Sequence, residues 1–288
     1  MTAPTGVYRF TSIARPVDPA YPTNRALLFL VPVAAAAAAL LHFAGLGHGD
    51  SAVSNAIAAA LASFGAWALT RELAPDDNPA AFVSFVLGFG AQLLWGPSTV
   101  IPLFVALVLV RVVNRSTGLQ PRVADAVLVT GFMVWATDRL GDPLVGLAAA
   151  IAFFLDASLS RPARWQLVTG FVCLTASMVF VMRDGVAMPA LAELQGAPFW
   201  LAIVVLTAYA VVTFTTRGIV SVGDVSGERL DAARVRGGMF VAGLLAAGAP
   251  VLPGERGMNT LIWACLLGLT ASRILTGLSA RRRAASSN

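Results

Sequence analysis

The sequence predicts an all-α integral membrane protein of about ten transmembrane helices, with both chain ends on the cytoplasmic side. Three observations lead to this fold class. Hydrophobic residues make up 57% of the 288-residue chain and charged residues only 12%, whereas soluble domains carry roughly 25% charged residues. Apolar runs repeat along the whole chain, as they do in multi-pass proteins. Arginines collect in every second loop, which is typical of cytoplasmic loops.

Ten apolar runs are candidate spanning helices, and several are close to about 17 residues, the lower limit for crossing a bilayer. The predicted spans are 26–46, 51–70, 79–96, 98–114, 122–138, 142–160, 164–183, 197–217, 235–252 and 258–277. We therefore expect a cytoplasmic N-terminal tail over 1–25, a membrane domain over 26–277, and a basic, disordered cytoplasmic tail over 278–288.

The arginine distribution supports this number of helices. All 20 basic residues are arginine. If the N-terminus lies inside and the helices alternate in direction, 17 arginines fall on the cytoplasmic side, and only Arg139, Arg183 and Arg256 fall outside. Such an asymmetry fixes orientation in a bilayer. It predicts a multi-pass protein of the bacterial cytoplasmic (inner) membrane, and it explains the positive net charge without a nucleic-acid partner.

The interior of the predicted bundle offers little ionisable chemistry. Cys173 and Cys265 both lie within apolar runs and are expected to be buried small hydrophobic residues. With only His42 and His48 besides, a structural zinc site is excluded and no metal site is predicted. No Asp, Glu or His lies near the middle of a span, which argues against a proton-coupled mechanism.

Two short segments resemble each other. Trp67–Pro79 and Trp135–Pro143 both read Trp-Ala, Thr, two charged residues, Leu, and then Asp before Pro. Three predicted helices separate them, and because this number is odd, the flanking helices run in opposite directions. This is the pattern of an inverted-topology repeat, which many transporters share. The alternative is a chance similarity between two membrane-interface segments.

Charged residues near the cytoplasmic ends of the helices are the candidate binding site. Arginine donates paired hydrogen bonds to phosphate or carboxylate, and four of the aspartates could hold a divalent ion beside such a group. Alternatively, these side chains simply reach the membrane surface. The candidate substrate-binding residues are Arg71, Glu72, Asp76, Asp77, Arg111, Asn114, Arg115, Asp125, Asp156, Arg161 and Arg164.

The longest cytoplasmic loop, 218–236, contains Ser226-Gly-Glu-Arg-Leu-Asp. Ser226 has the character of a helix N-cap and Glu228 that of a first-turn residue. We expect a short surface helix here that carries Arg229 and Arg234. It is either a connector lying on anionic headgroups or a partner-binding segment.

One stretch is similar to a known family. Asp77-Asn78-Pro79-Ala80, an apolar helix pair, and then Asn114-Arg115 and Gly118-Leu-Gln-Pro121 resemble the first half of the ten-helix membrane proteins of Rnf-type and Na⁺-translocating NADH:quinone reductase-type redox complexes. The resemblance spans about 60 residues and implies a ten-helix inverted-repeat fold, similar to that of urea channels. The Ser-Gly-Ala-Thr element that carries covalent flavin there is missing, and the nearest string, Arg115-Ser-Thr-Gly118, lies elsewhere.

The sequence favours a small-solute permease or channel-like transporter. The first alternative is a membrane enzyme that acts at the cytoplasmic face on a phosphorylated lipid or isoprenoid substrate. The second is a non-catalytic subunit of a membrane complex, which includes the redox-complex interpretation. The expected partners are the bilayer, a small molecule or lipid headgroup, and an oligomer or complex partner. No catalytic residue or cofactor is identified, because phosphate-loop, nucleophile-elbow and zinc-protease motifs are absent from the sequence.

Overall fold

A computed structural model describes residues 6–47, 50–95, 100–185, 197–251 and 259–286. Within these residues the chain forms one 3-10 turn and ten α-helices, and it forms no strand beyond an isolated bridge between Val222 and Arg229. The helices are α1 Pro22–Phe43, α2 Ala52–Leu73, α3 Asn78–Trp95, α4 Val100–Asn114, α5 Val123–Leu140, α6 Pro143–Ser158, α7 Gln166–Asp184, α8 Ala197–Thr215, α9 Ala232–Val251 and α10 Thr260–Ser286. Each overlaps one predicted span.

Local sequence signals set several helix ends. Ser51 caps α2 through a capping box with Ser54, which pairs amide groups that would otherwise lack a partner. Between α5 and α6 the chain turns at Gly141, whose φ of 63° is readily adopted by glycine. Asp142 then accepts a hydrogen bond from the Leu144 amide and Pro143 opens α6.

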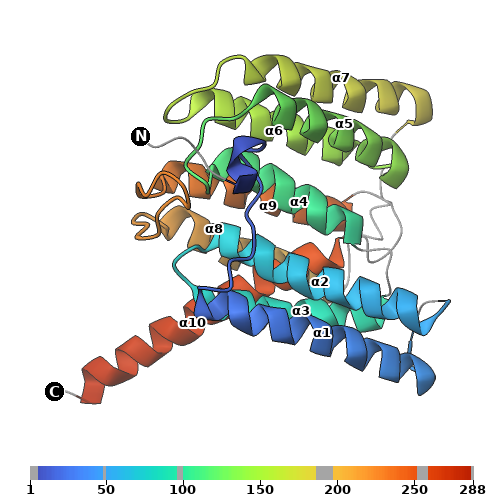
Figure 1. Cartoon of the computed structure of the whole chain (residues 1–288), viewed down its shortest axis with the longest axis vertical. Coiled ribbons are helices and arrows are strands. Elements are labelled where there is room, and N and C mark those ends of the chain that lie inside the picture. The colour runs from blue at the N-terminus through green and yellow to red at the C-terminus, as the bar shows by residue number, and fades with distance from the viewer. Residues whose placement is uncertain (1–5, 48–49, 96–99, 186–196, 252–258, 287–288) are drawn as a thin grey trace.

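The helices lie side by side in one bundle (Figure 1). The central pair α4 and α9 pack against each other, α6 covers them on one side, and α2 covers α4 on the other. Outside these, α5 and α7 pack on α6, while α1 and α3 pack on α2, and α10 lies against α3, α2 and α8. The interior is rich in alanine and glycine, which lets helices approach closely. A Cβ added at Gly88 of α3 would lie 2.7 Å from the Ala66 Cβ of α2.

Charged side chains gather at one end of this bundle, which we call the polar end. It contains the C-terminal ends of α2, α4, α6 and α8 and the N-terminal ends of α3, α5, α7 and α9, joined by the contacts described below. The opposite end carries Asp138 and Arg183, whose side chains pair at 2.6 Å. The 18 residues of α5 separate the two ends by about 27 Å, at about 1.5 Å per residue.

Three helices, α1, α2 and α7, are long and apolar enough to cross a membrane by length and composition. Five further apolar stretches are shorter, at 78–94, 100–114, 143–158, 199–215 and 260–276. The outward faces of α1 and α7 are strongly apolar, with Phe29 75% and Met182 85% exposed. Cys173 and Cys265 are both fully buried free thiols, which confirms their predicted place in the core.

One predicted element is wrong. No helix begins at Ser226, because Gly227 adopts a φ of 65° and the chain turns back there. The loop 216–231 is instead held by the Val222–Arg229 bridge and by a hydrogen bond from the Gly223 amide to the Glu228 carbonyl. The helix starts at Ala232, where the Asp231 carboxylate accepts a hydrogen bond of 2.7 Å from the Ala233 amide. Asp231, and not Ser226, therefore supplies the cap.

Candidate functional site

The first charged cluster of the polar end surrounds Glu72, the second-last residue of α2. Its side chain is only 1% exposed and lies 3.1 Å from both Arg111 of α4 and Arg15 of the N-terminal segment. Its backbone carbonyl accepts a hydrogen bond of 2.7 Å from the side-chain Nδ2 of Asn114. A buried carboxylate needs such pairing to remain charged. The cluster fixes α4 against α2 at this end of the bundle.

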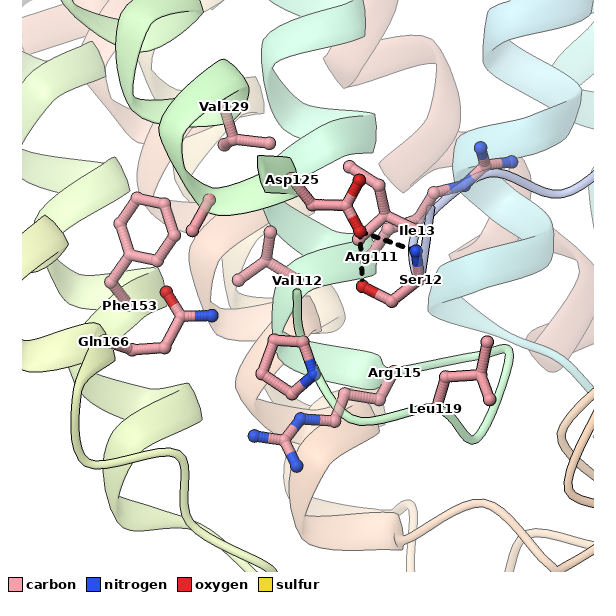
Figure 2. Close-up of a pocket in the computed structure, with 12 residues that line it drawn as sticks. Ser12, Ile13, Arg111, Val112, Arg115, Leu119, Asp125, Val129, Phe153 and Gln166 are labelled. Carbon is pink, nitrogen blue, oxygen red and sulfur yellow. Dashed lines mark hydrogen bonds between the residues drawn. The ribbon is translucent and has the colours of Figure 1, made fainter. Parts of the chain in front are cut away.

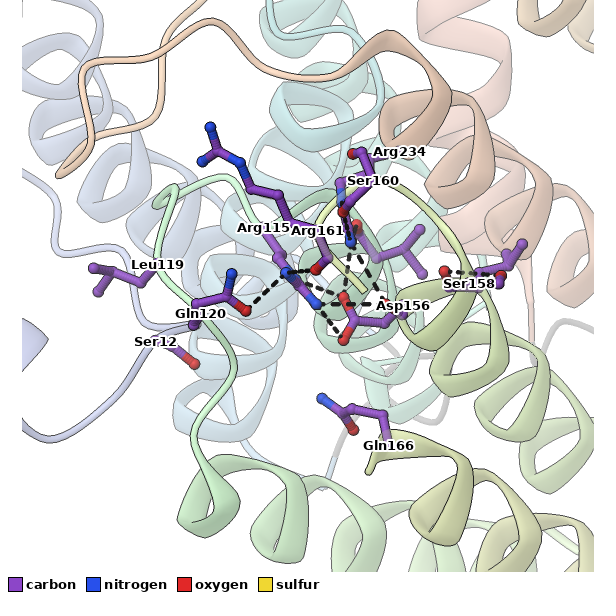
Figure 3. Close-up of polar contacts among 12 residues, drawn as sticks. Ser12, Arg115, Leu119, Gln120, Asp156, Ser158, Ser160, Arg161, Gln166 and Arg234 are labelled. Carbon is purple, nitrogen blue, oxygen red and sulfur yellow. Dashed lines mark hydrogen bonds and ion pairs between the residues drawn. The ribbon is translucent and has the colours of Figure 1, made fainter. Parts of the chain in front are cut away.

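The second cluster surrounds Asp156, which lies in the last turn of α6 and is completely buried. Arg115 binds it at two points, at 2.6 Å and 2.8 Å, and Arg234 of α9 approaches to 2.8 Å (Figure 3). Arg234 also donates to the carbonyls of Val113 and Ser160, and Arg115 donates to the Arg161 carbonyl. One carboxylate thus holds two arginines, and this cluster ties α6, α9 and the end of α4 together.

Residues 6–21 begin with the 3-10 turn Gly6–Arg9 and run across the polar end, and we call them the N-terminal strap. Ser12 donates to the Asp125 carboxylate from both its amide, at 2.5 Å, and its hydroxyl, at 2.6 Å (Figure 2). The Ser12 carbonyl accepts a hydrogen bond from the Thr117 hydroxyl. Arg122 donates to two carbonyls of the strap, those of Tyr8 and Arg9. The strap is therefore bound to the start of α5 and to the loop before it.

Arg15 joins the strap to two distant parts of the chain. It pairs with Glu72 and binds Asp224 of the α8–α9 loop at two points, at 2.6 Å and 2.7 Å. Burial alone would lower the pKa of the Arg15 guanidinium, but the neighbouring Glu72 and Asp224 carboxylates raise it instead. Arg15 stays cationic, and the strap remains anchored to α2.

Two adjacent aspartates in the α2–α3 turn bind different elements. Asp76 accepts hydrogen bonds from the amides of Val220 and Ser221 and from the Ser221 hydroxyl. Partial burial would raise the pKa of the Asp76 carboxyl, but these hydrogen bonds outweigh it and lower the pKa. Asp77 caps α3 through the Ala80 amide and accepts from Ser272 of α10. The pair thus holds the α8–α9 loop and α10 in place.

A pocket of about 310 Å³ lies among the three loops that follow α4, α6 and α8. This volume is near the lower limit of the roughly 300–1,000 Å³ usual for small-molecule sites. Its charged lining consists of Arg115, Arg161, Arg229, Arg234, Glu228 and Asp231. Arg161 and Glu228 form an ion pair of 2.6 Å in which both side chains are more than half exposed. The pocket is thus polar, open to solvent and rich in guanidinium groups.

A second, much smaller cavity of about 10 Å³ lies beneath the strap. Ser12, Arg111, Asp125, Phe153 and Gln166 line it (Figure 2). A cavity of this size accommodates about one water molecule. It is part of the packing between the strap and α5 and α6, and it does not accommodate a substrate.

Both arginines that flank the larger pocket on the α4 and α6 side have an unusual backbone. Arg115 and Arg161 adopt φ values of 48° and 53°, and they are the non-glycine residues with positive φ within the described residues. This region is uncommon for residues other than glycine, asparagine and aspartate. At Arg161 the turn presents the backbone carbonyl to Arg115 while the side chain points away from Asp156 (Figure 3).

The structure brings some predicted site residues together and separates others. Arg115, Asp156 and Arg161 meet around the larger pocket, which Asn114 also lines, and Glu72 pairs with Arg111. Arg71 instead stacks on the Trp67 ring and donates to Thr23, and Arg164 is exposed. The four aspartates 76, 77, 125 and 156 each bind a different partner, and within the described ranges no group of three or more His, Cys, Asp or Glu could hold a metal ion.

Three important residues were not predicted as part of the site: Ser12, Arg15 and Arg234. Ser12 and Arg15 fall in a polar, proline-containing segment that has the composition of a free tail. Arg234 was expected on a surface helix, yet its side chain is only 5% exposed. One sequence signal could have indicated it. Asp156 directly follows Phe153-Phe154-Leu155, and a carboxylate in such surroundings needs a cationic partner.

Comparisons with protein-family models, with curated proteins and with solved structures find no significant match to this chain.

Proposed function

We propose that this chain is a multi-pass protein of the bacterial cytoplasmic membrane, with the polar end on the cytoplasmic side. The proposal is supported by the outward apolar side chains and by the position of the arginines. The exposed apolar residues of α1 and α7 include Leu28, Phe29, Val33, Leu40, Phe43, Val168, Phe171, Val172, Met178 and Met182. A surface of this kind suits lipid contact, and arginine at one end suits the cytoplasmic leaflet.

Within that membrane, we assign the chain the role of a small-solute permease or channel-like transporter, with the 310 Å³ pocket as its cytoplasmic mouth. The observation that carries this assignment is the placement of that pocket, which opens at the polar end among the loops of three helices. Gln92 lies in the last turn of α3, at the opposite end of the bundle. It is 3% exposed, and neither polar atom of its side chain has a partner within the described residues. Polar groups inside a membrane bundle are characteristic of solute pathways.

The inverted repeat is part of the same proposal. The segment 67–79 lies at the polar end, and the segment 135–143 lies at the opposite end, where Asp138 pairs with Arg183. Opposite placement is what an inverted repeat requires. A superposition of the helices around 67–79 onto those around 135–143 tests it, since a chance similarity predicts no common helix arrangement.

The second candidate is a cytoplasmic-face enzyme that acts on a phosphorylated lipid or isoprenoid. The clustering of four arginines around one pocket at the polar end favours it. Against it stands the arrangement of the aspartates, each of which is occupied by a different element of the fold. The third candidate, a non-catalytic subunit of a membrane complex, stays a hypothesis, which the comparisons do not test.

Orientation is tested by labelling single introduced cysteines with a membrane-impermeant maleimide. Arg139→Cys at the end opposite the polar end should react in intact spheroplasts. Arg217→Cys at the polar end should react only after the membrane is opened. The two native thiols are buried and should give little background. Labelling of both positions from the same side would rule out a spanning bundle.

Transport is tested in proteoliposomes with a panel of urea, glycerol and inorganic phosphate. Wild-type protein should accelerate entry of at least one solute over protein-free liposomes. Gln120→Trp, which places a bulky ring in the pocket lining, should abolish the acceleration. Arg217→Gln, an exposed arginine of the same end outside the pocket lining, should leave it unchanged. Equal rates with and without protein would refute the transport proposal for these solutes.

A further inference from the structure

We infer that the 310 Å³ pocket binds a small phosphate-bearing anion, and that Arg229 and Arg161 are its direct ligands. The inference deepens the proposed function and rests on it, since it names the chemical class that would enter at the polar end. It is supported by the charge of the lining and by the donors that the fold leaves unused.

The pocket carries an excess of positive charge. Four arginines line it, against Glu228 and Asp231. Asp156 stands behind the lining, and its single negative charge is shared between Arg115 and Arg234. Counting all three carboxylates, one positive charge remains. Arginines around a partly enclosed pocket concentrate anions there.

Arg229 has its donors available. Its side chain is exposed, lines the pocket, and makes no hydrogen bond or ion pair with the residues that the structure describes. A free guanidinium presents five N–H donors in a planar fork, which matches two oxygens of a phosphate. Arg115 and Arg234 contribute differently: their donors are already bound to Asp156 and to backbone carbonyls, so they supply charge rather than new hydrogen bonds.

Arg161 can exchange its partner. Its ion pair with Glu228 is the single salt bridge among the described pocket-lining residues in which both side chains are more than half exposed, at 61% and 51%. Such exposed pairs contribute little, because solvent screens them. A phosphate dianion offers more acceptor oxygens than one carboxylate, so it can displace Glu228 and bind between Arg161 and Arg229. Glu228 is then a competitor of the ligand.

Asn114 lies at the back of the pocket and is not a ligand residue. The residue is 2% exposed and lines the pocket, and its Nδ2 donates to the Glu72 carbonyl, while its Oδ1 has no partner among the described residues. A buried acceptor without a donor is unfavourable. This oxygen faces Gly238 of α9, so it does not contact a ligand in the pocket. The preference for phosphate therefore rests on the arginines, because a phosphate offers more acceptor oxygens than a carboxylate.

The test measures binding to full-length protein in a neutral detergent at pH 7, by isothermal titration with inorganic phosphate and with glycerol phosphate. We expect saturable binding by the wild type. Arg229→Gln should weaken it about fivefold or more, as expected for loss of one charge-assisted contact. Glu228→Gln should strengthen it about threefold, since the ligand then no longer competes with a carboxylate for Arg161. Arg217→Gln is the matched control and should bind as the wild type does.

Nanodiscs identify the source of the phosphate group. In discs of phosphatidylcholine alone, added phosphate should titrate as it does in detergent. If discs that also contain phosphatidic acid abolish the titration in the wild type and not in Arg229→Gln, a lipid headgroup occupies the site. If the titration is unaffected, the ligand is a soluble phosphate.

The inference is overturned if the folded wild type gives no saturable signal with inorganic phosphate, glycerol phosphate or phosphatidic acid discs, or if Arg229→Gln and Arg217→Gln reduce binding equally. Arg229→Lys keeps the positive charge but loses the planar set of guanidinium donors, and it should bind phosphate with intermediate affinity. Because this assay requires no transport, the two proposals fail separately. Binding without flux would contradict the permease, and flux without phosphate binding would contradict this site.

Discussion

Asp156 and Arg115 form a two-point ion pair in which Nε lies 2.6 Å from Oδ1 and Nη2 lies 2.8 Å from Oδ2. The same carboxylate also holds Arg234, whose side chain is 5% exposed. Both arginines therefore depend on one buried negative charge, so we expect Asp156 to contribute strongly to the stability of the polar end.

Asp156→Asn is expected to destabilise the protein by about 3–5 kcal/mol, because it leaves two buried guanidinium groups without a counter-charge. Urea unfolding in detergent, followed by circular dichroism, measures this change. The control is Asp138→Asn, which breaks an exposed pair with Arg183 at the opposite end and should have no measurable effect. A similar small effect of both substitutions would show that Asp156 is dispensable.

Arg15→Gln should release the N-terminal strap. It removes the ion pairs to Glu72 and Asp224, each a charge-assisted contact, and opening of the strap should become roughly tenfold more frequent. Chymotrypsin cleavage after Tyr8 or Phe10 reports that opening. Arg9→Gln is the control within the strap, since the described residues make no hydrogen bond or ion pair with the Arg9 side chain. Equal cleavage of the wild type and Arg15→Gln would contradict the anchoring role.

The α8–α9 loop should loosen in acid. The folded-state pKa of Asp76 is depressed below its ordinary value of 3.8 by hydrogen bonds from Ser221 and Val220. A depressed pKa stabilises the folded state above the unfolded value, and this contribution is lost as pH falls through the folded value. Hydrogen exchange of the Val220 and Ser221 amides should therefore be protected at about pH 6 and lose protection below about pH 3.8. Asp76→Asn, compared at each pH, should remove the pH dependence.

Gly238→Ala should disturb the packing of α9 on α4. A Cβ at this position would lie 2.3 Å from the Asn114 Oδ1. Either the Asn114 side chain would shift and lose its hydrogen bond to the Glu72 carbonyl, or the helices would move apart, at an expected loss of about 1–3 kcal/mol. Thermal unfolding in detergent is the measurement. Gly131→Ala in α5 is the matched control: it meets nothing within 4 Å and should stabilise the helix by up to about 1 kcal/mol. A stabilised Gly238→Ala variant would contradict the close contact.

The helices could be predicted from the sequence because each is an apolar run between polar segments. Even the short separation between the third and fourth spans is confirmed, since α3 ends at Trp95 and α4 begins at Val100. The helix expected at Ser226 is wrong because a capping residue followed by glycine is equally compatible with a turn. Arg256, one of the three arginines expected outside, lies beyond the described residues.

The candidate site was only partly predictable. That charged residues gather at one end follows from the alternation of helices and loops. Their pairing does not, because Ser12 and Asp125 are 113 residues apart and Arg15 and Asp224 are 209 apart. No local periodicity encodes such contacts. Arg234 shows the same limit, since only the packing of α9 against α6 places its guanidinium beside Asp156.

The strap also has a consequence for the order in which the protein matures. Its residues are synthesised before the ten helices, yet Arg15 cannot reach Asp224 until the ribosome has produced α8 and the following loop. Contacts between residues so distant in sequence form late. The contact between the strap and the α8–α9 loop thus forms late, and a bulky group fused before the strap should impair assembly more than the same group fused after α10.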